Sequence, residues 1–179
     1  MINLEALDQT WIDGKIDDPQ DQCSHGYVNF SIGDTVFLSH EDGEFTTSGA
    51  ALFLLRTLSS DRTADTSITE SNLLFPCCAF NPWLTAENNS LVVMGCNGGT
   101  DVSIRHLPGN LVAIEAGDKL ATATEAEWVT AVLAFVDQVE QFYSSSSPKA
   151  PIEDDDDRSG WAAFWLEWRH TTNRYRSAA

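Results

Sequence analysis

The segment 124–143 constrains the fold of this chain most, because it combines a helix start signal with a long apolar stripe. Its first residues have the Thr-x-x-Glu spacing of a capping box, in which each side chain satisfies a free backbone N–H group of the other residue. The apolar residues that follow recur at spacings of four, three, four and three: Trp128, Val132, Phe135, Val139 and Phe142. Residues with this period lie along one face of a helix. We therefore expect an amphipathic helix that packs on a sheet.

Two stretches of the chain show the patterns of antiparallel strands. In the first, residues 27–32 alternate between apolar and polar, and residues 35–39 form a return strand. In the second, strands at 91–94, 101–106 and 111–115 are separated by glycine-containing turns. We expect the second stretch to form two consecutive hairpins, which make an antiparallel meander.

A length of 179 residues is in the range of one domain. We expect a single domain over 1–179 with an α+β fold, in which a mostly antiparallel sheet carries helices packed mainly on one face. The sequence leaves open whether the two groups of strands form one sheet or two. The expected helices are at 48–58, apolar nearly all round and so deeply buried, at 124–143 and at 159–171. The other expected segments are a polar N-terminal segment at 1–26, a short buried strand at 73–75, an aromatic loop at 80–89 and an acidic linker at 144–158.

Charge is the first guide to function. Twenty-seven acidic and ten basic side chains give a net charge of −17, and residues 1–157 alone carry −20. Such a surface repels phosphate backbones and anionic bilayers, so we expect no nucleic-acid partner and no membrane partner. It attracts a basic protein. The alternative is that the acidity serves solubility and selects no partner.

The carboxylates gather in three clusters, each of which is either a solvated charge run or a site for basic residues of a partner. A calcium loop is not expected. Counted from Asp154, the glycine and glutamate that an EF-hand needs at its sixth and twelfth positions are replaced by Ser159 and Trp165. The clusters are Asp13, Asp17, Asp18 and Asp21; Glu41, Asp42 and Glu44; and Glu153, Asp154, Asp155, Asp156 and Asp157.

Aromatic residues dominate the last expected helix, where Trp161, Phe164, Trp165 and Trp168 share one face. Tryptophan and arginine are enriched in binding hot spots, so Trp165, Trp168 and Arg169 can form an exposed anchor for a partner. In the alternative, the helix folds back and closes the core that the 124–143 helix leaves open.

Catalytic motifs are absent from the sequence: it contains no GxSxG, Walker loop, HExxH or GxGxxG. One catalytic or small-molecule-binding interpretation remains, a Cys/His site at the 95–106 hairpin, with Cys96 as nucleophile, His106 as base and Asp101 as the third group. A nucleophile needs a base within hydrogen-bond reach, and no spacing places one beside Cys96. We therefore expect a non-enzymatic protein without a cofactor.

The four cysteines, Cys23, Cys77, Cys78 and Cys96, form no CxxC motif. Cys23 and His25 offer two metal ligands but lack a second pair at useful spacing, so no metal site is expected. We expect reduced, buried cysteines that act as small apolar side chains. Their even number leaves disulfides as the alternative.

Several sequence runs occur together in the second half: Gly95-Cys96-Asn97-Gly98-Gly99-x-Asp101, Phe135 to Tyr143, Ser147-Pro148-Lys149, and Gly160-Trp161-x-x-Phe164-Trp165-x-Glu167-Trp168. With these runs, residues 91–169 resemble small uncharacterised bacterial proteins associated with the immunity proteins that protect bacteria from the toxins of neighbouring cells. The resemblance carries over no catalytic residue. It implies a small, acidic, cytoplasmic binding protein.

Charge and resemblance together predict an immunity-type inhibitor of a basic toxin or effector protein. The N-terminus lacks the basic-then-apolar order of a secretion signal, so we expect a cytoplasmic location. The oligomeric state is left open. The expected partner-binding residues are Glu41, Asp42, Glu44, Asp154, Asp155, Asp156, Asp157, Trp165, Trp168 and Arg169.

Overall fold

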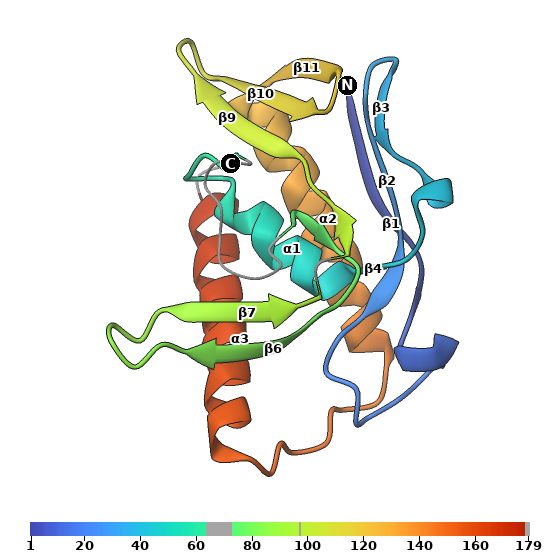
Figure 1. The fold of residues 1–179 in the computed structure, drawn as a ribbon, viewed down its shortest axis with the longest axis vertical. Coiled ribbons are helices and arrows are strands. Elements are labelled where there is room, and N and C mark those ends of the chain that lie inside the picture. The colour runs from blue at the N-terminus through green and yellow to red at the C-terminus, as the bar shows by residue number, and fades with distance from the viewer. Residues whose placement is uncertain (64–72, 97, 178–179) are drawn as a thin grey trace.

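A buried helix lies at the centre of an α+β fold, with antiparallel strands and two longer helices around it (Figure 1). The computed structural model describes residues 1–63, 73–96 and 98–177. In the central helix, α1 (Thr47–Arg56), every residue from Thr47 to Leu55 is buried. A helix that is apolar nearly all round has no face for solvent. The predicted deep burial of this helix is therefore confirmed.

The first sheet has β1 (Ile2–Thr10), β2 (His25–Ile32) and β3 (Thr35–Leu38) in that order, and the short β4 (Phe45–Thr46) also pairs with β2. Alternate residues of β2 are buried, as the alternation of its sequence predicts. The strands expected at 27–32 and 35–39 are thus confirmed.

We expected only a polar segment over residues 1–26, but the structure has a nine-residue strand there. β1 pairs antiparallel with β2 from Ile2 opposite Ile32 onward, and Leu4 is buried in the core. The segment does alternate between apolar and polar residues over positions 2–6. Its aspartates lie mainly in the loop that follows β1, where they do not oppose strand formation.

The second sheet has the order β11–β10–β9, formed by β9 (Ser103–Leu107), β10 (Leu111–Ala116) and β11 (Lys119–Thr124). The hairpin expected between 101–106 and 111–115 is confirmed, whereas β11 was not expected. No backbone ladder joins this sheet to the first one within the part of the chain that the structure describes. The two strand groups therefore form separate sheets.

A long, interrupted hairpin replaces the other half of the expected meander. β6 (Ala79–Leu84) pairs with β7 (Leu91–Gly95), and β5 (Phe75–Pro76) pairs with β8 (Gly99–Thr100). The prediction of a hairpin between 91–94 and 101–106 is therefore wrong, and so is the prediction of a loop over 80–89. The expected buried strand at 73–75 corresponds to β5. β6 contains a proline, which is tolerated in a strand at the edge of a sheet.

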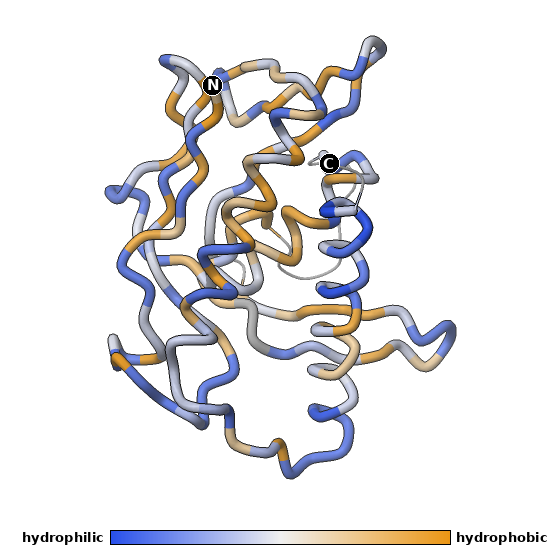
Figure 2. Tube along the Cα trace, turned by 180° about the vertical axis from the view of Figure 1, so that it is seen from behind, coloured by the Kyte–Doolittle hydropathy of each residue, from blue (hydrophilic) through white to orange (hydrophobic). Residues whose placement is uncertain are grey.

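The helix expected at 124–143 is α2 (Glu125–Ser145), and its capping box between Thr124 and Glu127 is present. Its apolar face packs on β1 and α1. Figure 2 shows hydrophobic segments through the middle of the molecule and mostly hydrophilic segments at its lower end. The helix predicted from the apolar periodicity of residues 124–143 is thus confirmed.

The last helix, α3 (Asp155–Arg176), is longer at both ends than the expected 159–171. Its N-cap is Asp154, whose carboxylate accepts backbone N–H groups from Asp156 at 2.9 Å and Asp157 at 3.0 Å. Carboxylates in a first helical turn are stabilised by the free N–H groups there. Most of the acidic block therefore belongs to the helix, and the linker expected at 144–158 shortens to 146–154.

A buried hydrogen bond joins α1 to α2, and we expect Thr57→Val to lower the free energy of unfolding by about 1–3 kcal/mol, because it leaves a buried donor unpaired. The indole N–H of Trp128, 1% exposed, donates to the Thr57 hydroxyl at 3.1 Å. Urea unfolding measures the change. Thr130→Val is the matched control, since that exposed hydroxyl donates only to Ala126 of its own helix. Equal midpoints for the two variants would contradict the role of this bond.

Candidate functional site

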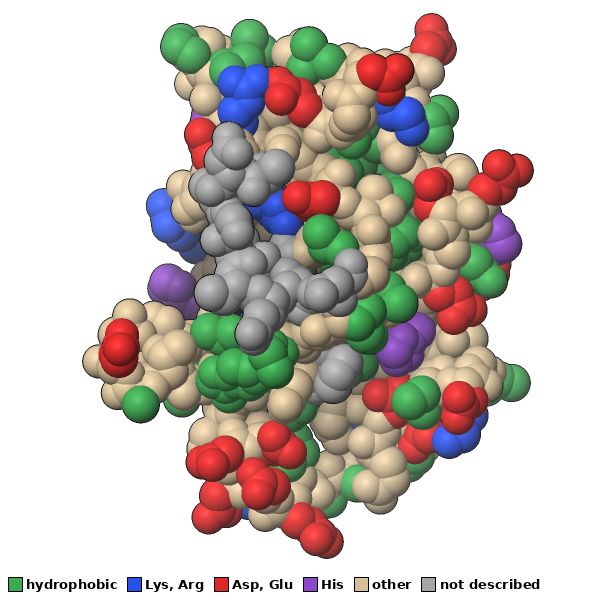
Figure 3. All heavy atoms as spheres, viewed as in Figure 1, with side chains coloured by type: hydrophobic (Ala, Val, Ile, Leu, Met, Phe, Trp, Pro, Cys, Tyr) green, Lys and Arg blue, Asp and Glu red, His purple; other side chains and the backbone are tan. Residues whose placement is uncertain are grey.

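Two of the three acidic clusters meet at one end of the molecule, although about 130 residues separate them in the sequence (Figures 1 and 3). Backbone and side-chain hydrogen bonds join the loop after β1 to the linker before α3. Ser147 N donates to Asp17 Oδ1 at 3.1 Å, and Ala150 N donates to Pro19 O at 2.8 Å. Residues 13–21 and 147–158 thereby form one surface, which we call the acidic end.

The acidic end holds nine carboxylates and three cations. Each cation is engaged locally, in the contacts Lys15–Asp18, Arg158–Asp155 and Lys149–Trp11. Among the described residues, no cation lies within ion-pair distance of Glu153, Asp156 or Asp157, and all three are exposed. The surface therefore presents unpaired negative charge to solvent.

Local contacts tune the charged groups of this surface. The Lys15 ammonium donates a hydrogen bond to Asp18 at 2.7 Å and holds the pKa of that carboxyl below its ordinary value. Burial lowers the pKa of Lys149, an effect that the neighbouring carboxylates Asp21, Asp17 and Asp18 oppose. The Lys149 ammonium also donates to the backbone oxygen of Asp18 at 2.9 Å, which joins the linker to the loop.

A groove of about 560 Å³ opens between the two segments of the acidic end. Its lining combines apolar side chains, among them Ile152 and the buried Trp161, with the carboxylates of Glu153 and Asp157. Apolar and acidic side chains therefore line the same groove. Such a groove matches a side chain with an aliphatic stem and a cationic head.

The third acidic cluster lies apart from the other two, on the connection between β3 and β4. Glu41 and Asp42 belong to the 3-10 helix η2 (His40–Asp42), in which Ser39 and Asp42 form a capping box. Glu41, Asp42 and Glu44 are exposed. No hydrogen bond or ion pair in the described part of the chain joins them to the acidic end. The structure thus offers two separate acidic surfaces.

The exposed tryptophan anchor is not formed as expected, because Trp168 is 1% exposed and belongs to the core. Its indole N–H donates to Glu140 at 2.7 Å. Trp165 is half-buried, with its ring centroid 5.1 Å from that of Tyr143, and only Arg169 of this set is exposed. The apolar stripe of α3 therefore closes the core, which corrects the placement of Trp168 at a docking surface.

The Cys96–His106–Asp101 site is not assembled either. The Nδ1 atom of His106 lies 2.9 Å from Asp61 Oδ1, whereas Asp101 is paired with Arg62 at 2.8 Å. No hydrogen bond between Cys96 and His106 occurs in the described residues. The reason is topological, because the strand that carries His106 pairs with β10 and not with β7.

Cys96 belongs instead to a cluster of three thiols that the sequence did not predict. The sulfur atoms of Cys77, Cys78 and Cys96 all lie within 4.8 Å of one another. Cys77 is exposed and the other two are half-buried, so the expectation of buried cysteines holds only for Cys23. We call these three residues the thiol cluster.

The thiols of the cluster differ in acidity. The hydrogen bond from Cys78 holds the pKa of Cys96 below its ordinary value, while burial raises the pKa of Cys78 to about 11. The pKa of Cys77 is raised by its hydrogen bond with Cys96. Cys96 is therefore the thiol of the cluster that most readily becomes a thiolate. Cys23, buried elsewhere, has a raised pKa because of its burial.

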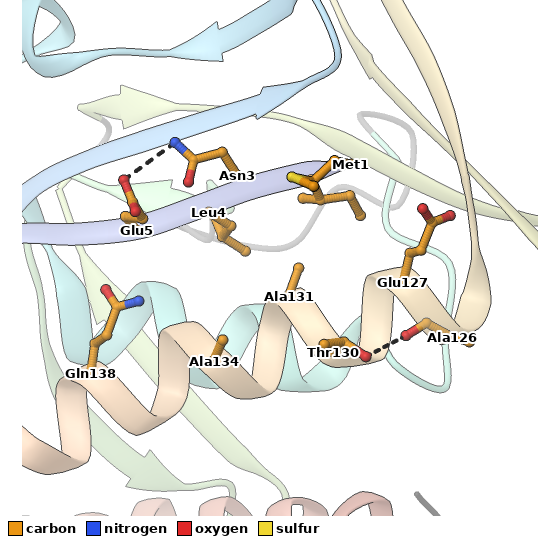
Figure 4. A pocket seen from close by; sticks show the side chains of 11 residues that line it. Met1, Asn3, Leu4, Glu5, Ala126, Glu127, Thr130, Ala131, Ala134 and Gln138 are labelled. Carbon is orange, nitrogen blue, oxygen red and sulfur yellow. Dashed lines mark hydrogen bonds between the residues drawn. The ribbon is translucent and has the colours of Figure 1, made fainter.

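A further groove, of about 580 Å³, runs between the edge strand β1 and α2 (Figure 4). Small side chains of α2, Ala126, Ala131 and Ala134, form one wall. Gln138 closes one end, where its side-chain oxygen accepts the backbone N–H of Ala6 at 2.8 Å. Glu5 and Glu127 also line the groove, which forms the seam between strand and helix.

Comparison with protein-family models, with curated proteins and with solved structures finds no match. None of the helices in the described ranges combines the length and the apolar character needed to cross a bilayer. The acidic end and the thiol cluster are therefore the two features from which a function can be argued.

Proposed function

We propose that the protein is a non-enzymatic binding protein whose acidic end docks a basic protein and blocks it. The observation that carries this proposal is the meeting of two distant acidic segments around one groove. The resemblance of residues 91–169 to immunity proteins favours a toxin or effector as the partner. The alternative Cys/His chemistry has no comparable support, because its residues have other partners.

The charge of the acidic end favours fast association with a basic partner. Nine carboxylates against three engaged cations give this surface a net charge of −6. A concentrated field of one sign raises association rates by about 10- to 1,000-fold at low salt. Exposed charges gain little affinity by themselves, so the steering effect appears mainly in the association rate.

The groove supplies the specificity that charge alone lacks. A lysine or arginine side chain can lay its methylenes on Ile152 and Trp161 while its cationic head reaches Glu153 or Asp157. An aromatic side chain beside carboxylates favours arginine most, because its planar head both stacks and donates bidentate hydrogen bonds. We propose a basic loop of the partner as the occupant of this groove.

The test begins by searching the neighbouring genes for a basic protein that binds this chain, and it uses that protein as the partner. Its association with the intact protein is measured by stopped flow at low salt and at about 1 M salt, where the screening length is ~3 Å. The acidic-end variant carries Glu153→Gln, Asp156→Asn and Asp157→Asn, which keep the helix cap at Asp154. We expect about a tenfold slower association for this variant at low salt, and loss of growth rescue when partner and variant are co-expressed.

A matched control removes three negative charges outside the acidic end, by Asp34→Asn, Glu87→Gln and Asp118→Asn in exposed turns. A third variant, with Glu41→Gln, Asp42→Asn and Glu44→Gln, tests the separate acidic cluster. The proposal requires the acidic-end variant to be slowed far more than either of the others. Equal slowing of all three, or a rate that ignores salt, would show that the acidic end does not direct binding.

A further inference from the structure

We propose that Cys77, Cys78 and Cys96 form a three-thiolate site for a soft, closed-shell metal ion, Zn²⁺ or Cu⁺. The three sulfur atoms come from the connection between β5 and β6 and from the residue after β7, and they lie within 4.8 Å of one another. Thiolates that share one ion with metal–sulfur bonds of ~2.3 Å lie ~3.8–4.0 Å apart. The sulfur atoms of the cluster are therefore almost as close together as three thiolates bound to one metal ion.

The thiols converge because the interrupted hairpin changes register at this point. The β5–β8 ladder ends with Pro76 opposite Gly99, and the β6–β7 ladder begins with Ala79 opposite Gly95. Two residues separate these pairs on one strand and three on the other, so the register shifts by one residue. Such shifts redirect side chains and are frequent beside functional sites. Here the shift turns all three thiols towards one point.

Close approach of the two strands depends on a glycine next to the cluster. Gly99 has φ +129°, a region that favours glycine. A Cβ at this position would overlap the carbonyl oxygen of Phe75 and lie 2.8 Å from the backbone nitrogen of Cys77. The ladders on both sides of the shift then hold the cysteine backbones in place, which pre-organises the ligands before an ion arrives.

Backbone N–H groups point at the sulfur atoms, as the second shell of a thiolate site requires. Gly98 N lies 3.3 Å from Cys96 Sγ, and Cys96 N lies 3.2 Å from Cys78 Sγ. Donors of this kind stabilise negative charge on metal-bound sulfur and tune the site. Two of the three sulfur atoms thus have a donor supplied by the fold itself.

Accessibility and ligand type select the class of ion. Cys77 is exposed, which leaves an entry path from solvent. Sulfur ligands prefer Zn²⁺ and Cu⁺ to Mg²⁺ or Ca²⁺, which take oxygen ligands. Three thiolates satisfy a trigonal Cu⁺ ion, whereas Zn²⁺ takes a fourth ligand from solvent or from a bound molecule.

The first test titrates the reduced, metal-free chain under anaerobic conditions. Co²⁺ serves as the optical probe for the Zn²⁺ arm, because thiolate coordination gives a sulfur-to-cobalt charge-transfer band that Zn²⁺ then displaces. A colorimetric Cu⁺ chelator serves as the competitor in the Cu⁺ arm. We expect one ion per chain in at least one arm, and the arm with tighter binding identifies the ion.

Variants decide whether the three thiols are the ligands. Cys77→Ser, Cys78→Ser and Cys96→Ser should each weaken binding by more than ~100-fold, since loss of a ligand costs more than loss of its second-shell partner. Cys23→Ala, at a buried cysteine outside the cluster, should bind normally. Circular dichroism checks the folding of each variant, and Cys77→Ser remains decisive because its side chain is exposed.

Four results would overturn the proposal. The first three are no stoichiometric binding in either arm, unchanged binding by Cys77→Ser, and equal loss with Cys23→Ala. The fourth is a chain that loses two thiols in air and binds neither ion after reduction, which would identify a redox pair instead. The acidic-end variant should bind the ion normally. Its behaviour separates the thiol cluster from the docking function proposed above.

Discussion

Gly160→Ala is expected to lower the free energy of unfolding by ~3 kcal/mol, because the added methyl group meets the backbone of a neighbouring strand. Gly160 lies in the first half of α3, where the helix crosses β6. A Cβ at this position would overlap Pro82 O, lie 2.5 Å from Pro82 C and lie 3.0 Å from Trp83 Cα. Backbone atoms cannot rotate away as side chains do, so the whole helix must move.

Movement of α3 away from β6 would also loosen the aromatic side chains beside the glycine. Trp161 and Phe164 are 7% and 1% exposed, and both belong to the core. Urea unfolding followed by tryptophan fluorescence measures the loss. The control is Ser159→Ala, one position earlier on the exposed side of the helix, which should change stability by less than ~0.5 kcal/mol. A stable Gly160→Ala protein with an unchanged midpoint would contradict the close approach.

Trp11→Ala should cost about 3–5 kcal/mol and also take the acidic end apart. The Trp11 ring is fully buried, and its centroid lies 4.8 Å from that of Phe142 and 5.0 Å from that of Tyr143. Its indole N–H donates to Ser146 Oγ at 3.1 Å, and the Lys149 ammonium lies 2.8 Å from a ring centroid. The side chain thus joins the loop after β1 to the end of α2 and to the linker.

Two measurements separate the stability effect from the local effect. Urea unfolding gives the loss of stability, and limited proteolysis under native conditions gives the opening of residues 12–24 and 146–154. We expect faster cleavage in both segments, because each loses its shared support. Ile16→Ala is the control, since Ile16 is 90% exposed in the same loop. Cleavage that stays as slow as in the Ile16→Ala protein would mean that Trp11 does not hold the acidic end together.

Local periodicity predicted the elements whose residue pattern is compatible with only one kind of secondary structure. The capping box and stripe of α2, the apolar character of α1 and the alternation of β2 all belong to this class. The errors arose where tertiary pairing decides between structures. β1 and β6 contain residues that are poor in isolated strands, and each is stabilised by its neighbour, β2 or β7.

The sequence showed the residues of the candidate sites but not that they lie close together in the fold. The acidic clusters are visible in the sequence, but their meeting depends on hydrogen bonds between residues about 130 positions apart. The thiol cluster was missed because residues 80–89 were assigned to a loop. Pairing of 79–84 with 91–95 would have placed Cys78 beside Cys96, since these residues follow directly on the Ala79–Gly95 pair. Because the strand at 79–84 was missed, the three candidate metal ligands were not predicted to lie together.

The length of α3 separates charges of opposite sign. Its first turn carries Asp155, Asp156 and Asp157, and its last turn carries Arg174 and Arg176 at the other end of a helix ~33 Å long, where Arg176 is paired with Asp137 and Glu140. Separated charges form a dipole, and a positive body exerts a torque that turns the carboxylate pole towards itself. The helix thus contributes to turning the acidic end towards a positive body, which lowers the number of collisions lost to wrong orientations.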